Sequence, residues 1–448
     1  MWKEWLLLAN SVVITLIISL GIINWLAPGL LGVATDLQLV KIDRKVPPFY
    51  EGALRRKDFQ TADFLLKDPI TRVRARPLLP LRSEGGPHDI LGFRNAAVPI
   101  TADIVTIGDS MTYGNNALME ENWPSRMREF LGEKDISLYN MSTGGWGAVQ
   151  YLNMFQNATL FQPRVIVIAF YTGNDPLDSF IMAYGNNHWG WLKPDPSLSS
   201  EDAPRVDFPP PKDERWPVSF RDGIETVFTP RLRLVSNQDS PAAKAGYAIM
   251  TRVVRHISEL VEHLNIRLVV TIIPTKEFVY ARKITQEGLS MPEDYLVLVE
   301  NERRNITAIA DVIRTLPNAD YIDVAAPLEI AALGPTELYL PTMNGHPAAE
   351  GYRIIGETVA TGIKGMIPPK PSGHFILNDG NVHIGLVIKK GEVWFFDSPE
   401  IMEGNGWPVD NAPEIKRRDI AGLDYGGRIS TIDPVKYGPE KTRVSAVQ

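Results

Sequence analysis

The sequence contains no cysteine among its 448 residues, and this absence excludes several kinds of chemistry. Without thiols the chain has no disulfide, no thiolate nucleophile and no cysteine-ligated metal. It also lacks any lysine- or arginine-rich run, and its 53 acidic side chains outnumber its 46 basic ones. Proteins bind nucleic acids through clustered positive charge, so we do not expect a nucleic acid as a partner.

Metal and nucleotide motifs are missing as well. None of the 7 histidines stands in an H-E-x-x-H or H-x-x-E-H spacing, the pattern of helical zinc sites. Gly144, Gly145 and Gly147 do not form the G-x-G-x-x-G pattern of dinucleotide sites. The sequence therefore predicts neither a metal nor a cofactor.

A long apolar run is present near the amino terminus. No charged residue lies between Glu4 and Asp36, and about 20 apolar helical residues cross the roughly 30 Å hydrocarbon core of a bilayer. The spacing of Trp5 and Trp25 would place their indoles at opposite interfaces. We predict a transmembrane anchor over residues 5–32. The alternative is a cleaved signal peptide, which the length of the run and the lack of an A-x-A-like site argue against.

Two further segments flank the central part of the chain. Residues 33–100 are punctuated by prolines and predict an extended connector, with one short helix around Ala62–Lys67. Residues 368–448 predict a small β-rich extension, in which Lys389-Lys390-Gly391-Glu392 forms the turn of a hairpin. We expect this extension to contact a partner rather than to carry chemistry.

Residues 101–367 alternate short, β-branched-rich apolar runs with longer segments of helical spacing. Such runs are typical of strands buried on both faces of a parallel sheet. The predicted strands are Ile104–Ile107, Ile136–Tyr139, Val165–Phe170, Leu268–Ile273 and Tyr321–Val324. The predicted helices are Trp123–Leu131, Ala242–Leu264, Tyr295–Leu316 and Ala348–Ile367. Together they predict a three-layer, doubly wound parallel α/β domain.

Residues 176–240 interrupt this alternation with a segment rich in proline and tryptophan. The segment is too long for an ordinary connection between a strand and a helix. It follows the carboxyl end of a strand, where the ligand crevice of such a sheet lies. We predict either a lid over that crevice or a docking surface for another protein.

Residues that could carry chemistry follow the predicted strands. Ser110 comes directly after the first strand, at a sharp turn where its hydroxyl would be exposed above the sheet. Gly145 follows the second strand, Asn174 follows the third, and His346 precedes the last helix. Histidine is the usual base for a serine nucleophile. Because the carboxyl ends of parallel strands share one crevice, we expect these four residues to form one site.

In this order the four loops resemble the sequence blocks of the SGNH (GDSL) hydrolase family. They read Gly108-Asp109-Ser110, Ser142-Thr143-Gly144-Gly145, Thr172-Gly173-Asn174-Asp175 and Asn344-Gly345-His346-Pro347. The resemblance spans roughly residues 89–365 and implies a flavodoxin-like α/β fold with ester chemistry. It implies that Ser110 is the nucleophile and His346 the general base. The implied oxyanion hole combines the backbone of Ser110 and Gly145 with the side chain of Asn174, and Asp109 and Asp175 would hold their loops.

Asn344 is the one departure from the family pattern. Family members place an aspartate two or three residues before the histidine, where this sequence has Met343 and Asn344. An asparagine accepts a hydrogen bond but does not offset the charge of an imidazolium, and in serine proteases this exchange costs about 10⁴ in turnover. Asp323, near the end of the fifth strand, or a backbone carbonyl is the alternative partner for His346. Lys276 and Tyr280 follow the fourth strand and either line the crevice or, for Lys276, extend into solvent.

Two functions of different classes fit these features. The first is a membrane-anchored serine ester hydrolase or O-acyltransferase of SGNH type, acting on an acyl ester through Ser110 and His346, with Asn344 as the third member. The second is a catalytically weak or silent domain that serves as a structural subunit of a membrane protein complex. In both cases the lipid bilayer is a partner. The family resemblance favours an extracytoplasmic, in bacteria periplasmic, soluble domain.

Overall fold

The computed structural model describes most of the chain between residues 65 and 368. The described ranges are 65–68, 70–76, 79, 85–89, 91–99, 102–132, 136–205, 208–262, 264, 266–368, 386–389 and 392–395. The anchor predicted over residues 5–32 lies outside them, so it stays a prediction. Within these ranges, no helix combines the length and the apolar character needed to span a bilayer.

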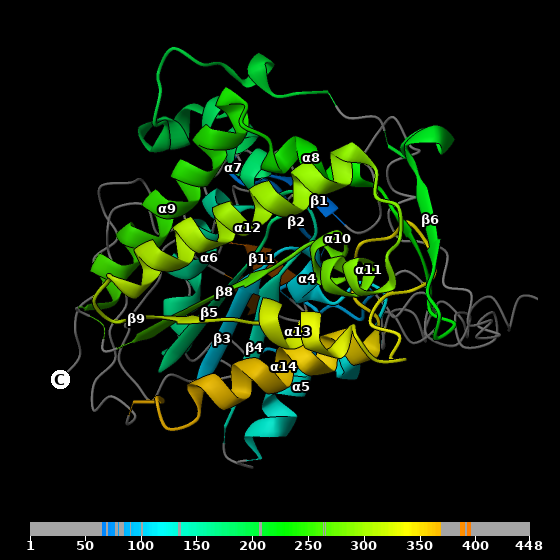
Figure 1. Cartoon of the computed structure of the whole chain (residues 1–448). Coiled ribbons are helices and arrows are strands. Elements are labelled where there is room, and N and C mark those ends of the chain that lie inside the picture. Colours follow the sequence, from blue (N-terminus) through cyan, green and yellow to red (C-terminus); the bar gives the residue numbers. More distant parts are fainter. Residues whose placement is uncertain are drawn as a thin grey trace, which may run out of the picture.

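A five-stranded parallel sheet forms the centre of the described structure (Figure 1). Its strands are β3 (Ile104–Gly108), β4 (Leu138–Ser142), β5 (Val165–Tyr171), β8 (Arg267–Ile273) and β9 (Ala319–Ile322). They lie in the order β4-β3-β5-β8-β9, and all neighbouring pairs are parallel. This is the flavodoxin-like doubly wound order, with a switch point between β3 and β5. The predicted parallel α/β class is confirmed.

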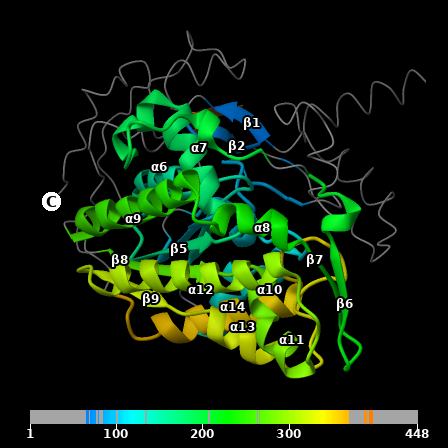
Figure 2. The same ribbon diagram turned by 45° about the horizontal axis from the view of Figure 1, so that its top comes forward.

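Helices cover both faces of the sheet (Figures 1 and 2). One face carries α6 (Ala148–Ala158), α7 (Asp175–Gly185), α9 (Pro241–Glu262) and α12 (Glu293–Arg314). The other carries α5 (Trp123–Leu131), α13 (Ala325–Ala331) and α14 (Ala349–Ile363). Successive residues of β5 point to opposite cores, with Ile166 and Ile168 in one and Val165 and Val167 in the other. This double burial explains why the central strands are almost continuously apolar.

The remaining elements are short. They are the helices α4 (Ser110–Tyr113), α8 (Pro230–Asn237), α10 (Lys276–Val279) and α11 (Ala281–Glu287) and the 3₁₀ turns η2 (Met119–Glu121), η3 (Thr159–Phe161), η4 (Asn187–Leu192), η5 (Ser200–Asp202) and η6 (Lys212–Glu214). An antiparallel hairpin joins β6 (Trp216–Ser219) to β7 (Glu225–Phe228). The proline- and tryptophan-rich segment 176–240 therefore contains most of α7, three 3₁₀ turns, this hairpin and α8.

One predicted element is wrong. The short helix expected around Ala62–Lys67 is, in its described part, the strand β1 (Leu65–Asp68), which pairs antiparallel with β2 (Arg72–Ala75). The Asp68 carboxylate accepts the N–H groups of Ile70 (2.7 Å) and Thr71 (2.8 Å) and so closes the turn between the strands. This turn chemistry, with a proline after Asp68, outweighs the helical spacing of the apolar residues.

The two segments flanking the central part are described only in part. The end of the predicted connector contacts the sheet, because Asp89 accepts the Tyr139 hydroxyl (2.8 Å) and Asn95 accepts the Asn140 N–H (3.0 Å). In the extension, β10 (Leu386–Lys389) pairs antiparallel with β11 (Glu392–Phe395), as expected for the predicted hairpin. The other residues of 368–448 beyond Pro368 lie outside the described part.

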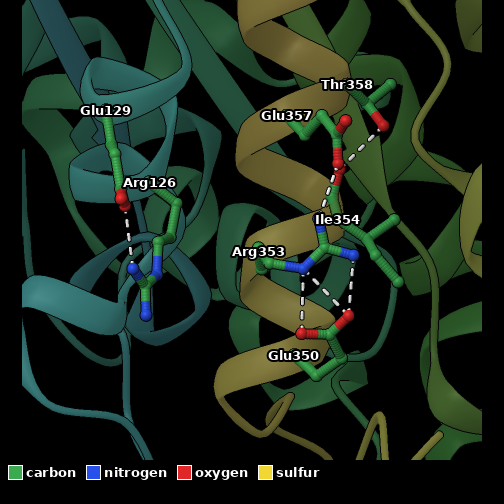
Figure 3. A network of polar contacts seen from close by, with 7 residues as sticks. All are labelled: Arg126, Glu129, Glu350, Arg353, Ile354, Glu357 and Thr358. Atoms are coloured by element: carbon green, nitrogen blue, oxygen red, sulfur yellow. Dashed lines mark hydrogen bonds and ion pairs between the residues drawn. The ribbon is translucent and has the colours of Figure 1, made fainter.

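The contact between α5 and α14 depends on a glycine. A Cβ at Gly356 would lie 2.7 Å from the carbonyl oxygen of Trp123, so any larger residue would push the two helices apart. Figure 3 shows charged side chains on the same pair of helices, where Arg353 forms ion pairs with Glu350 and Glu357. Exposed ion pairs of this kind contribute at most about 1 kcal/mol each. The close approach of the helices is therefore the stronger constraint, and it fixes the helix that follows His346.

Candidate active site

The site begins at the turn that ends β3. Asp109 caps α4 by accepting the Met111 N–H (2.8 Å), and Ser110 is the first residue of that helix. A Cβ at Gly108 would lie 2.0 Å from the Thr112 hydroxyl oxygen, so the turn requires glycine. The tight turn holds Ser110 at the carboxyl end of the sheet, as predicted.

Ser110, His346 and Asn344 form a hydrogen-bonded chain. Ser110 Oγ lies 2.7 Å from His346 Nε2, and His346 Nδ1 lies 2.6 Å from Asn344 Oδ1. The backbone N–H of His346 also donates to this Oδ1 (3.0 Å). Because a backbone N–H is always a donor, the atom that faces the imidazole must be the oxygen of the carboxamide. Nδ1 therefore carries the proton, and Nε2 accepts the Ser110 hydroxyl.

The sequence left open which group orients His346, and the structure places Asn344 there. Asp323 has another role, since its carboxylate accepts the N–H of Ala325 (2.9 Å) at the start of α13. Lys276 does not extend into solvent. It is completely buried, and its ammonium donates to the carbonyls of Thr342 (2.6 Å) and Asn344 (3.1 Å). Tyr280 is also completely buried. The solvated alternative for Lys276 is therefore wrong, and the crevice position of the two residues stays a prediction.

The surroundings of His346 favour the neutral imidazole. The side chains of Ser110 and His346 are buried, with 1% and 4% of their residue surfaces exposed. Burial, together with the positive charges of Arg233 and Lys276, lowers the pKa of His346 to about 3. Burial also lowers the pKa of Lys276, to about 7. The base is therefore free to accept a proton at neutral pH, but it is a weak base.

The two predicted oxyanion donors lie in the loops on either side of Ser110. In the sheet, Gly108 pairs with Ser142 of β4 and with Ala169 of β5, so the loops that follow these strands flank the Ser110 turn. Gly145 has a φ of 78° and open space where a Cβ would be. Asn174 donates one N–H of its carboxamide to Asp178 (2.6 Å), which leaves the other N–H for a ligand.

Buried carboxylates hold these loops together. Asp175 accepts the Tyr171 N–H and the Tyr151 hydroxyl, both at 2.9 Å, as expected for a residue that fixes its loop. Burial raises the pKa of Asp175 well above its usual range and that of Asp109 to about 7. Within the described ranges, no group of three or more histidine, aspartate or glutamate side chains is arranged to hold a metal ion.

Sequence reasoning missed Asn116, six positions after Ser110 in the chain. Its carboxamide accepts from Asn344 Nδ2 (3.0 Å) and donates to the His346 carbonyl (3.2 Å). The one available signal was the Gly114-Asn115-Asn116 sequence after α4, because asparagine tolerates left-handed backbone at the end of a helix. That signal predicts a turn and says nothing of the histidine.

Comparisons with known proteins give only remote structural similarities. No family model and no curated protein matches the chain. A lipolytic protein of the G-D-S-L family from Desulfitobacterium hafniense is 15% identical with a TM-score of 0.31, over 58% of this chain and 97% of that one. TesA is 13% identical with a TM-score of 0.32, over 59% and 98%. The acetylxylan esterase Axe2 from Geobacillus stearothermophilus, as a catalytic mutant, is 12% identical with a TM-score of 0.34, over 59% and 95%. These values are too low to assign a fold family or an activity.

The low pKa of His346 can be tested directly. We expect its imidazole to stay neutral, with the proton on Nδ1, from pH 7.5 down to pH 4.5, because its folded pKa is about 3. Nitrogen NMR of ¹⁵N-histidine-labelled protein measures this, and a His346→Gln variant identifies the resonance. A protonation midpoint above pH 5 would contradict the prediction.

Proposed function

We propose that this chain is a serine ester hydrolase or O-acyltransferase of SGNH type that acts on an acyl ester. The observation that carries the proposal is the series of hydrogen bonds from Ser110 Oγ to His346 Nε2 (2.7 Å) and from His346 Nδ1 to Asn344 Oδ1 (2.6 Å). A serine hydroxyl is a weak nucleophile until an adjacent base removes its proton. The imidazole is in the tautomer that this step needs.

The mechanism follows from the protons of the site. Ser110 Oγ attacks the ester carbonyl carbon while its proton passes to His346 Nε2. The N–H groups of Ser110 and Gly145 and the carboxamide of Asn174 stabilise the oxyanion. His346 then gives the proton to the leaving alcohol, and an acyl-enzyme on Ser110 remains. Water or a sugar hydroxyl then attacks the acyl group while His346 Nε2 takes its proton. The bond between the acyl carbon and Ser110 Oγ breaks, and His346 returns the proton to Ser110 Oγ.

Asn344 gives the imidazole its direction but no compensating charge. In serine proteases, replacing the aspartate of the triad by asparagine costs about 10⁴ in turnover because the histidine takes the wrong tautomer. Here the carboxamide oxygen faces Nδ1, so the tautomer is correct. Only the stabilisation of the imidazolium is missing. We therefore infer a slow enzyme rather than an inactive one.

One observation favours the second candidate function, a silent structural subunit of a membrane complex. Ser110 and His346 are almost completely buried, at 1% and 4% exposure, so an ester must displace covering groups to reach the hydroxyl. Access to the hydroxyl distinguishes the two functions, because a silent subunit needs none.

We also propose that residues 5–32 anchor the protein to a membrane as a single span, with the α/β domain on the extracytoplasmic side. The uncharged run between Glu4 and Asp36 supports this. An anchored enzyme would remain near a surface-bound acyl ester, whereas a structural subunit would use the span as a contact surface for other membrane proteins.

The nucleophile can be tested by covalent labelling. We expect a fluorophosphonate probe to label the full chain in detergent, because Ser110 is activated by His346. Ser110→Ala should abolish the label, and Ser125→Ala, a serine on α5 whose hydroxyl bonds to the Met119 carbonyl (2.8 Å), should keep it. In-gel fluorescence measures both. A folded wild-type protein that takes no label would favour the silent subunit.

The missing carboxylate gives a second prediction. Asn344→Asp should raise kcat for short-chain ester hydrolysis by about tenfold or more, because a carboxylate stabilises the imidazolium and 1.4 kcal/mol corresponds to one factor of ten. The same change should raise the pKa of His346 and move the acid limb of the pH–rate profile upward. Asn344→Ala serves as the control and should lower kcat. An unchanged rate in the Asp variant would mean that substrate access, not basicity, limits turnover.

The anchor gives a third prediction. The full chain should sediment with membranes and resist extraction by high salt, because a spanning helix is held by the hydrocarbon core. Replacing Leu16 and Ile17 by lysine should release it, since charges at the centre of a span are costly. Fractionation followed by amino-terminal sequencing measures both. A mature soluble protein that begins beyond Gly32 would disprove the anchor.

A further inference from the structure

The direction of the Asn344 carboxamide decides whether His346 can act as a base. A carboxylate has two equivalent acceptor oxygens, so either oxygen would accept the Nδ1 proton. A carboxamide has one acceptor and one donor end. If Asn344 were turned over, its NH₂ group would face Nδ1, and the imidazole proton would move to Nε2. His346 would then offer Ser110 no acceptor for its proton, and the Asp109 carboxyl, with Oδ2 3.3 Å from Ser110 Oγ, would be the remaining partner.

Asn116 fixes this direction from the opposite side. Its Oδ1 accepts from Asn344 Nδ2 (3.0 Å), and its own Nδ2 donates to the His346 carbonyl (3.2 Å). Together with the His346 N–H, which donates to Asn344 Oδ1 (3.0 Å), these bonds close a ring in which every donor meets an acceptor. Turning over either carboxamide would place like groups against each other at two contacts or more.

The backbone around Asn116 is held independently of this ring. The guanidinium of Arg94, which is 4% exposed, donates to the carbonyls of Gly114 (2.7 Å) and Ala117 (2.9 Å). The Tyr352 hydroxyl of α14 donates to the Asn115 carbonyl (2.9 Å). The carbonyls before and after Asn116 are thus each bonded to a side chain from another part of the chain.

Asn116 itself has a left-handed backbone, with a φ of 70°. Most residues with a Cβ avoid this conformation, and asparagine tolerates it better than most. The hydrogen bonds to the carbonyls of Gly114, Asn115 and Ala117 fix this turn. With its left-handed φ, the turn directs the Asn116 carboxamide toward the histidine loop.

We propose that Asn116 is a positioning residue: together with the His346 N–H, it holds the orientation of the Asn344 carboxamide and thereby the tautomer of His346. Two neutral amides in series do the orienting work that one carboxylate does in a Ser-His-Asp site. This inference rests on the proposed function for its consequence in turnover. The tautomer that it predicts is a property of the protein without substrate.

The alternative is that Asn116 is a simple structural link between the loop after α4 and the histidine loop. Such a link would affect folding stability but not the position of the imidazole proton. The two roles therefore differ in the tautomer of His346 and in how kcat changes relative to KM.

The experiment compares three substitutions in the full chain. Asn116→Ala removes both bonds, Asn116→Gly removes them and also relieves the left-handed backbone, and Asn116→Asp keeps the acceptor for Asn344 Nδ2. Asn318→Ala is the matched control, because Asn318 has a similar φ of 57° in the turn before β9. Asn318 lies at the amino ends of the parallel strands, whereas Ser110 lies at their carboxyl ends. Nitrogen NMR of labelled histidine reports the tautomer, and short-chain ester hydrolysis reports kcat and KM.

We expect the Ala and Gly variants to lose the pure Nδ1–H state and to lower kcat by at least about tenfold, with KM changed less than twofold. The loss is bounded by the about 10⁴ that a wrong tautomer costs in a triad. Asn116→Asp should keep the Nδ1–H tautomer and restore most of kcat, and Asn318→Ala should change neither.

Two results would overturn the proposal. One is an Asn116→Ala variant that keeps the Nδ1–H tautomer, and the other is an Asp variant as impaired as Ala, which would mean that a structural bond to the His346 carbonyl matters instead. If the wild-type chain proves to have no esterase activity, the proposed function fails, but the NMR comparison still decides the role of Asn116.

Discussion

The neutral carboxamide of Asn344 orients the imidazole of His346, and the hydrogen bonds of the surrounding loops depend on that contact. A carboxylate in this place would both orient the ring and attract the proton that arrives from Ser110. Asn344 does only the first, and its two ends differ, so its own orientation must be fixed. The ring formed by Asn116, Asn344 and the backbone of His346 meets this need with hydrogen bonds alone. Arg94 supports the site indirectly, because its hydrogen bonds to the Gly114 and Ala117 carbonyls hold the turn that carries Asn116.

The charges near the site also disfavour the protonated form of His346. Burial disfavours a positive charge on His346, and the positive charges of Arg233 and Lys276 disfavour it further. The nearest carboxylate to the nucleophile belongs to Asp109, whose Oδ2 lies 3.3 Å from Ser110 Oγ. Burial raises the pKa of Asp109 to about 7, and the charge of Asp178 contributes to the rise. Near neutral pH this carboxyl is therefore only partly ionised and offsets little of the positive potential. In the proposed mechanism, proton transfer from Ser110 to His346 is therefore unfavourable unless the negative charge of the oxyanion compensates the positive charge on the imidazole.

The sequence permits prediction of those parts of the site that depend on local pattern. Ser110, Gly145 and Asn174 follow buried strands, and the parallel order of β4, β3 and β5 brings their loops to one edge. Asn344 was predicted as the third member from its place two residues before His346, but its own partner Asn116 was not predictable in the same way. Asn116 and Asn344 stand more than two hundred positions apart, and only the tertiary fold opposes their amides. The solvated alternative for Lys276 failed for a similar reason, since a lysine after a strand is usually solvated and only the carbonyls of the histidine loop explain its burial. The hairpin β1–β2 was missed because Asp68 closes a turn where apolar spacing suggested a helix.

The segment 176–240 is more closely joined to the site than a detached lid would be. In α8, the Ser236 hydroxyl donates to the Gly173 carbonyl (3.1 Å), and Asn237 donates to the Thr172 carbonyl (3.0 Å). These two carbonyls directly precede Asn174, the predicted oxyanion donor. The same helix carries Arg233, whose guanidinium lies so close to the histidine loop that a Cβ on Gly345 would be 2.8 Å from its Nη2. One helix of the insertion thus holds the backbone before Asn174 and places a positive charge beside His346. A displacement of α8 would therefore change both the backbone before Asn174 and the positive charge beside His346.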